Sequence, residues 1–101
     1  MGKGFRKGKW RDIQGTGLQG YIKTTYRKLV SRFGKPGKGD KYKTDAEWIL
    51  VFDDGTVASV YNYKDGRNYL GPKGKPVSQI TNWHVGGNRK KAVALVRAAL
   101  R

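Results

Sequence analysis

The chain has no cysteine, few acidic residues and no long apolar run, and each of these absences excludes a class of protein. Without cysteine there is no disulfide framework, no thiolate zinc site and no cysteine nucleophile. Seven Asp and Glu stand against 22 Lys and Arg, which gives a net charge of +15. No apolar stretch approaches the ~20 residues that span a bilayer, and no apolar signal-peptide region follows Met1. We therefore expect a protein of the cytoplasm.

The surplus of positive charge indicates a polyanionic partner. At +15 on 101 residues the folded chain repels itself, and a partner of opposite charge relieves that repulsion. Membrane surfaces are anionic as well, so charge alone leaves the kind of partner open. With 37% hydrophobic residues, the chain has enough apolar surface for one modest core. We expect one domain over residues 16–101, preceded by a basic, flexible arm over residues 1–15.

Residues 1–15 combine glycines and cations with two aromatic residues, Phe5 and Trp10. Such a segment cannot bury enough apolar surface to fold alone. Aromatic rings placed between cations can stack on nucleobases while the cations contact phosphates. The alternative is that Trp10 anchors the arm on the core of the domain. The candidate binding residues of the arm are Lys3, Arg6, Lys7, Lys9, Trp10 and Arg11.

Apolar periodicity predicts the first elements of the domain. Residues 18–22 alternate as in a short strand. A helix follows over residues 26–33, whose apolar side chains recur at i, i+3, i+4 and i+7. Thr24 or Thr25 is its expected N-cap, and Gly34 stands where such a helix ends.

Further strands and a second helix complete the expected fold. Trp48, Leu50 and Phe52 alternate with apolar neighbours, which indicates a central strand. An Asp-Gly turn then favours a hairpin. The remaining expected elements are strands over 46–52, 56–63 and 77–85, a short strand over 67–70 and a final helix over 89–101. We expect an α+β fold, with a small antiparallel sheet of three to four strands and two helices on one face.

The stretch around Gly86 and Gly87 carries the strongest functional signal. We expect these glycines to form a tight turn that leads into the final helix, with Asn88 as its N-cap. Three consecutive cations then occupy the first helical turn, where they oppose the helix dipole. Their presence indicates that an anion binds beside the exposed amides. The candidate residues of this site are Gly87, Asn88, Arg89, Lys90, Lys91 and Arg97.

No group of residues makes a persuasive catalytic site. Asp45 and Glu47 share a strand face and are the candidates for a metal-dependent nuclease. Asp53 and Asp54 are residues that a tight turn favours. His84 is the single histidine, so no histidine cluster for zinc exists. We expect no enzymatic activity, no cofactor, no bound metal, no membrane partner and no small-molecule substrate.

The order of helix, three strands and helix, ending in Gly-Gly-Asn-Arg-Lys-Lys-Ala, resembles a double-stranded-RNA-binding domain. Gly86, Gly87, Lys90 and Lys91 match the glycine-rich turn and lysine pair that grip phosphates across a groove in that family. The chain departs from the family at Ala94, where a third lysine is usual, and lacks its Gly-Pro-x-His loop. The resemblance implies binding of duplex or structured RNA through the final helix.

The motifs Phe33-Gly34-x-Pro36, Asp54-Gly55-Thr56-Val57-Ala58 and Trp83-His84-Val85-Gly86-Gly87 are similar to those of small domains encoded by bacteriophages. This second resemblance spans most of residues 18–100. It implies a setting, the cytoplasm of a bacterial host, rather than an activity. Phage proteins of this kind act on nucleic acid or modulate host machinery. Two further motifs of the resemblance are Ala46-Glu47-Trp48 and Tyr61-Asn62-Tyr63-Lys64.

We expect a non-catalytic protein that binds the phosphate backbone of RNA or DNA with little sequence specificity. The alternative is a phage-encoded inhibitor of a host protein or of a defence ribonucleoprotein, of the anti-CRISPR or host-takeover type. A metal-dependent nuclease is the third hypothesis. Single strands are favoured if aromatic residues of the arm stack on bases, and duplexes if the final helix dominates.

Overall fold

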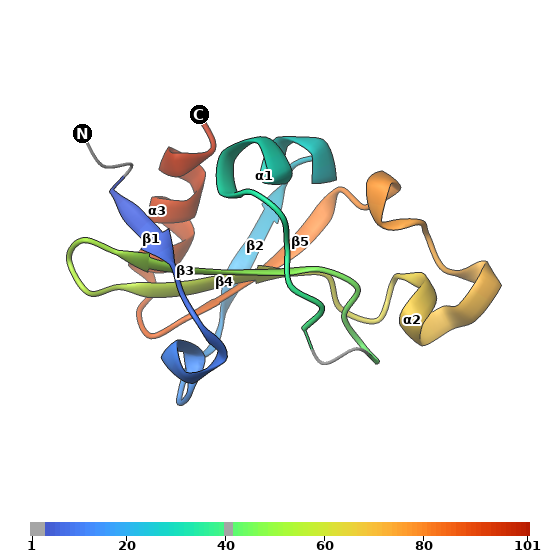
Figure 1. Cartoon of the computed structure of the whole chain (residues 1–101), viewed down its shortest axis with the longest axis horizontal. Coiled ribbons are helices and arrows are strands. Elements are labelled where there is room, and N and C mark those ends of the chain that lie inside the picture. The colour runs from blue at the N-terminus through green and yellow to red at the C-terminus, as the bar shows by residue number, and fades with distance from the viewer. Residues whose placement is uncertain (1–3, 40–41) are drawn as a thin grey trace.

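The computed structural model describes residues 4–39 and 42–101, which form an α+β fold around a five-stranded antiparallel sheet (Figure 1). The strand order is β1-β3-β4-β5-β2. The strands are β1 (Phe5–Lys7), β2 (Gly17–Lys23), β3 (Glu47–Phe52), β4 (Val57–Tyr61) and β5 (Asn82–Gly87). The helices are α1 (Tyr26–Phe33), α2 (Arg67–Leu70) and α3 (Lys91–Ala99), with 3-10 turns at Trp10–Ile13, Gly71–Lys73 and Val77–Gln79. The fold class is as expected, but the sheet is larger than the three to four strands predicted.

The side chains of β3 alternate between the core face of the sheet and the opposite face, which we call the open side. Trp48, Leu50 and Phe52 are buried on one face of the strand, while Ile49 and Val51 are half-buried on the other. This is the pattern expected for a strand covered on both faces. β3 lies between β1 and β4, so it is a central strand as predicted.

Helix α1 forms as the sequence predicts. Its N-cap is Thr25, whose Oγ1 accepts a hydrogen bond from the amide of Lys28 at 3.1 Å. Leu29 and Phe33 are buried on its inner face. The helix ends at Gly34, which has a φ of +86° that a residue with a Cβ rarely adopts.

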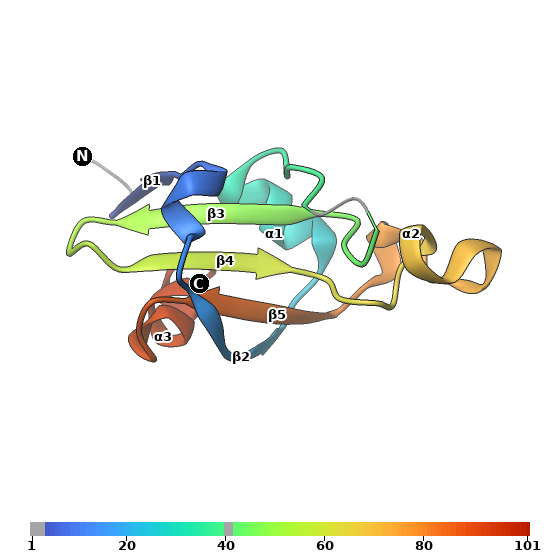
Figure 2. The same ribbon diagram turned by 90° about the horizontal axis from the view of Figure 1, so that it is seen from below.

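Helices α1 and α3 cover the same face of the sheet, as Figure 1 shows. Ala92 and Val96 of α3 are buried in one core with Trp83 and Val85 of β5 and with the inner face of α1. In the view of Figure 2 the opposite face is toward the reader, and the turn Trp10–Ile13 crosses it over β3 and β4. None of the helices among the described residues is long and apolar enough to span a membrane.

The N-terminal segment is part of the fold over its described residues, so the predicted flexible arm is wrong from Gly4 onward. β1 pairs with β3, and the ring of Phe5 packs on Phe33 and Phe52 at centroid distances of 5.4 and 5.9 Å. The amide of Gly8 then donates to the carbonyl of Ile49 at 2.8 Å. Pairing with an existing strand supplies the hydrogen bonds and apolar cover that the segment lacks alone. Lys3 lies outside the described residues.

The Gly86-Gly87 pair does not form the predicted turn, because both residues lie inside β5. Gly87 lies where α3 crosses the sheet, and a Cβ built on it would lie 2.7 Å from both the Cβ of Ala92 and the carbonyl oxygen of Val57. These glycines therefore permit close packing rather than an unusual φ. The side chain of Asn88 accepts the amide of Val57 at 3.0 Å, so Asn88 extends the sheet and is not the N-cap. Lys90 occupies the N-cap position without a side-chain cap, and α3 begins at Lys91 rather than Arg89.

Two predicted strands also differ from the structure. Residues 67–70 form the short helix α2, and residues 77–79 form a 3-10 turn before β5 begins at Asn82. Buried Asn62 explains the first difference. Its side chain accepts the amide of Asp45 at 2.8 Å and donates to the carboxylates of Asp45 and Asp65 at 2.9 and 3.1 Å. This polar network holds the chain after β4 away from the sheet.

Candidate nucleic-acid interface

The cationic corner between β5 and α3 consists of Arg89, Lys90 and Lys91, all exposed. Within the described part of the chain, Arg89 and Lys90 make no ion pair. Lys91 forms one with Asp54 in the β3–β4 turn. The ion pair holds the pKa of the Asp54 carboxyl well below its usual range, and hydrogen bonds from Thr56 act in the same direction. The corner therefore offers two free cations rather than the three that the sequence predicts.

Two backbone amides at the start of α3 are already hydrogen-bonded within the protein. The amides of Ala92 and Val93 donate to the carbonyls of Arg89 and Lys90 at 3.1 and 3.3 Å. These bonds satisfy donors that a bound anion would otherwise use. Any attraction for phosphate at this corner rests mainly on the side chains of Arg89 and Lys90.

Two other predicted residues of this region are engaged with the fold. Gly87 is buried in β5, where its carbonyl accepts the side-chain amide of Gln19 at 3.0 Å. Arg97, on the exposed face of α3, donates to the carbonyl of Tyr21 at 3.4 Å. This long contact leaves most donors of the guanidinium facing solvent.

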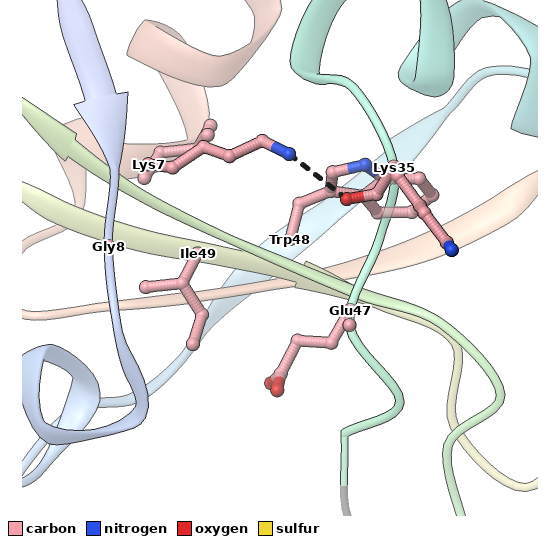
Figure 3. A pocket seen from close by; sticks show the side chains of 8 residues that line it. Lys7, Gly8, Lys35, Glu47, Trp48 and Ile49 are labelled. Atoms are coloured by element: carbon pink, nitrogen blue, oxygen red, sulfur yellow. Dashed lines mark hydrogen bonds between the residues drawn. The ribbon is translucent and has the colours of Figure 1, made fainter.

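The cations of the N-terminal segment differ in whether they have a partner within the protein. Arg6 lies 4.0 Å from the carboxylate of Asp12. Lys7 extends across a pocket of about 130 Å³ and donates to the carbonyl of Lys35 at 3.1 Å, which ties β1 to the end of α1 (Figure 3). Lys9 and Arg11 flank Trp10, and both are exposed. Of the described cations in this segment, Lys9 and Arg11 are the ones that make no ion pair or side-chain hydrogen bond.

The two aromatic residues of the predicted arm have opposite environments. Phe5 is packed against the core, so its ring is not available for stacking. Trp10 is 63% exposed on the open side of the sheet. The structure thus leaves Trp10 as the candidate stacking residue of this segment.

Sequence reasoning missed an aromatic face on the open side of the sheet, made of Trp10, Leu18, Tyr21, Tyr61, Tyr63 and His84. Tyr21, His84 and Tyr61 are direct neighbours across β2, β5 and β4. The ring of His84 lies 4.9 Å from Tyr21 and 5.4 Å from both Tyr61 and Tyr63. The spacing of Tyr61 and Tyr63 by two residues was a usable signal. The face as a whole could not be predicted in this way, because the register of the sheet decides which side chains of four separate segments lie together.

A shallow hollow of about 290 Å³ opens beside this aromatic face. Trp10, Leu18 and Tyr63 are among the residues that line it, and Gly86 and Ser59 are neighbours across β5 and β4 there. Because Gly86 has no side chain, the centre of the sheet is recessed between larger neighbours. A Cβ at Gly86 would lie 2.8 Å from the hydroxyl of Ser59 and partly fill this space.

The surroundings of His84 favour the neutral form of its imidazole. Burial lowers its pKa from the ordinary value of 6.5, and the carboxylate of Asp65 only partly opposes that shift. Its Nδ1 is buried without a hydrogen-bond partner in the described structure. Burial also raises the pKa of the Tyr61 hydroxyl, with the carboxylate of Glu47 adding to the effect. The aromatic face is therefore uncharged at its centre.

Two of the carboxylates considered for nuclease chemistry, Asp45 and Asp54, make structural contacts within the fold. Both oxygens of Asp45 accept hydrogen bonds, one from Asn62 and the other from the amide of Asn68. Asp54 is paired with Lys91. Within residues 4–39 and 42–101, no group of three or more His, Cys, Asp or Glu side chains could hold a metal ion.

Comparison of the chain with known protein families, curated proteins and solved structures found no match.

Proposed function

We propose that the protein binds nucleic acid without catalysis, chiefly through the phosphate backbone. The observation that carries this proposal is the exposure of its positive charge. Every Lys and Arg predicted for the site that the structure describes is exposed: Arg6, Lys7, Lys9, Arg11, Arg89, Lys90, Lys91 and Arg97. Together with the net charge of +15, these exposed cations give a strong field that attracts a polyanion.

Two places on the surface supply phosphate contacts in this proposal. Arg89 and Lys90 form the first, on a short connection between a strand and a helix that both belong to the core. Lys9 and Arg11 form the second, on either side of Trp10. Since none of these four side chains is neutralised within the described structure, each can replace a counterion of the nucleic acid. If six phosphates are contacted in all, affinity falls ~10³-fold between 50 and 200 mM salt.

The elements α1, β3, β4, β5 and α3 give the helix, three strands and helix on which the resemblance to double-stranded-RNA-binding domains rests, but α2 and two 3-10 turns stand between β4 and β5. Of the two lysines that carry that resemblance, Lys90 and Lys91, the second is paired with Asp54. The exposed Trp10, by contrast, supports binding of unpaired bases. The proposal therefore covers both RNA and DNA. Because the sequence resembles small domains encoded by bacteriophages, the proposed setting is the cytoplasm of an infected bacterial host.

An electrophoretic shift panel tests the proposal. Single-stranded and duplex RNA and DNA of one random sequence are compared at 50 mM salt, then at physiological salt. We expect binding at 50 mM salt and weaker, roughly micromolar binding at physiological salt. Absence of any shift at both salt concentrations, together with capture of one host protein by the purified chain, would contradict it and favour the inhibitor.

A further inference from the structure

The aromatic face gathers several large, exposed side chains on one side of the sheet. Trp10 and Leu18 are 63% and 51% exposed, and Tyr21 and Tyr63 are 51% and 39% exposed. Four large apolar side chains thus face solvent on one side of a single sheet. Exposed apolar groups that gather in this way mark binding sites more often than scattered ones do.

We infer that the aromatic face receives unpaired nucleobases, so that the nucleic acid bound by this protein is single-stranded. This inference deepens the proposed function and rests on it. Stacking needs a base whose flat face is free, and in a duplex both faces are covered by neighbouring base pairs. The exposed rings of Trp10, Tyr21 and Tyr63 offer such a surface to any base, without sequence specificity.

The charge beside each exposed ring favours a nucleotide over an apolar protein segment as the occupant. Lys9 and Arg11 flank Trp10 in sequence. Lys23 follows Tyr21 by two residues along β2, so it lies on the same face of the sheet. The ammonium of Lys64 lies 5.2 Å from the ring centre of Tyr63. Each exposed ring thus has a cation near it, in sequence or in space, that can contact a phosphate of the bound strand.

Three carboxylates also border this face, and they lie mainly toward β3. Asp12 is engaged with Arg6 and with the amide of Lys9, and Asp65 accepts a hydrogen bond from Asn62. Glu47 lies directly across from Tyr61 on β3. These acids oppose phosphate on that side of the face. The backbone of a bound strand is therefore expected on the β2 side of the face, along Tyr21 and Lys23.

Tryptophan fluorescence provides a direct test, because the three tryptophans have very different exposure. Trp48 and Trp83 are buried, whereas Trp10 is 63% exposed. Stacking of a base on an indole quenches its emission, so a single-stranded oligonucleotide of uridine or thymidine should quench only the emission of Trp10. The Trp10→Phe variant should keep its affinity for the oligonucleotide and lose the quenching.

Alanine variants separate this inference from the proposed function. Trp10→Ala and Tyr63→Ala should each weaken binding of the single strand about 5- to 150-fold, the range that corresponds to one stacked base. They should leave the weaker duplex binding unchanged. Leu70→Ala is the matched control, since Leu70 is also exposed but lies in α2, outside the aromatic face. Circular dichroism and urea midpoints check that each variant remains folded.

The outcomes are distinguishable. If the protein binds neither single strands nor duplexes, the proposed function fails and this inference fails with it. If it binds both equally, without tryptophan quenching and without loss in Trp10→Ala, the inference fails and the proposed function stands. A single-strand preference that survives in both Trp10→Ala and Tyr63→Ala also overturns the inference.

Discussion

Lys91, the first residue of α3, forms an ion pair with Asp54 in the turn between β3 and β4. Asp54 also accepts the amide of Thr56 at 2.9 Å, which fixes the turn itself. One acidic residue therefore joins the hairpin to the helix and neutralises one of the three cations at the corner. The positive charge available to a ligand is set by this contact as well as by the number of lysines.

Replacing Asp54 with Asn should strengthen nucleic-acid binding. The change frees Lys91 and keeps a side-chain oxygen for the amide of Thr56. If Lys91 then contacts one phosphate, the slope of log K against log salt should steepen by about 0.7 to 0.9. Fluorescence anisotropy of a labelled oligonucleotide at several salt concentrations measures both effects.

Asp53→Asn is the control for that experiment. It changes the net charge equally at the adjacent position, but Asp53 makes no ion pair within the described part of the chain. The gain in affinity should therefore be larger for Asp54→Asn than for Asp53→Asn. Equal gains would mean that Lys91 contributes no contact and that net charge alone matters.

The stability of the protein should fall on mild acidification because of His84. Its folded pKa is lowered by burial, so the unfolded chain takes up a proton at higher pH than the folded chain does. The free energy of unfolding keeps its full value above the ordinary histidine pKa of 6.5. It decreases as the pH falls from there through the pKa of His84 in the folded protein. Urea unfolding at pH 7.5, 6.5 and 5.5 measures this dependence.

The variant His84→Gln should show a flatter pH dependence over the same range. His84 is the single histidine of the chain, so no other imidazole titrates in this interval. Asp54 does not contribute there either, since its pKa is held below the usual value of 3.8. An unchanged pH dependence in His84→Gln would show that another group is responsible.

Gly87→Ala should destabilise the protein, because a Cβ at this position would press on Ala92 and on the carbonyl of Val57. Overpacking of this kind costs roughly 1–3 kcal/mol. Gly17 is the natural control, since it pairs with Gly87 across β2 and β5 but has open space where a Cβ would lie. Gly17→Ala should change the free energy of unfolding by less than about 0.5 kcal/mol, as surface substitutions usually do. Equal unfolding midpoints for the two variants would refute the packing role assigned to Gly87.

Local patterns were sufficient for the elements that carry their own periodicity. Helix α1 has its cap, its apolar spacing and its terminal glycine within ten residues, and all three act as predicted. The same holds for the alternation in β3. The α+β class and the placement of α1 and α3 on one face followed from the order of such segments, but the third helix, α2, was not predicted.

Errors arose where a segment takes its structure from a distant partner. β1 is three residues long and is stable only beside β3, so it resembled an arm in the sequence. Residues 67–70 form a helix whose Asn68 amide donates to Asp45, a residue distant in sequence that also accepts a hydrogen bond from Asn62. The Gly86-Gly87 pair serves close packing, which the sequence does not distinguish from a turn. The aromatic face depends on register across three strands and was therefore outside the reach of local patterns.

The most direct test of the account compares how salt affects binding by three proteins: the natural chain, Arg89→Gln with Lys90→Gln, and Arg27→Gln with Arg32→Gln. The last pair makes the same change of charge on exposed residues of α1. For a single-stranded ligand, we predict that loss of Arg89 and Lys90 lowers the affinity and reduces the salt slope by about 1.4, while the α1 variant keeps nearly the natural slope. The same slope in all three proteins, or binding that does not respond to salt, would contradict the account.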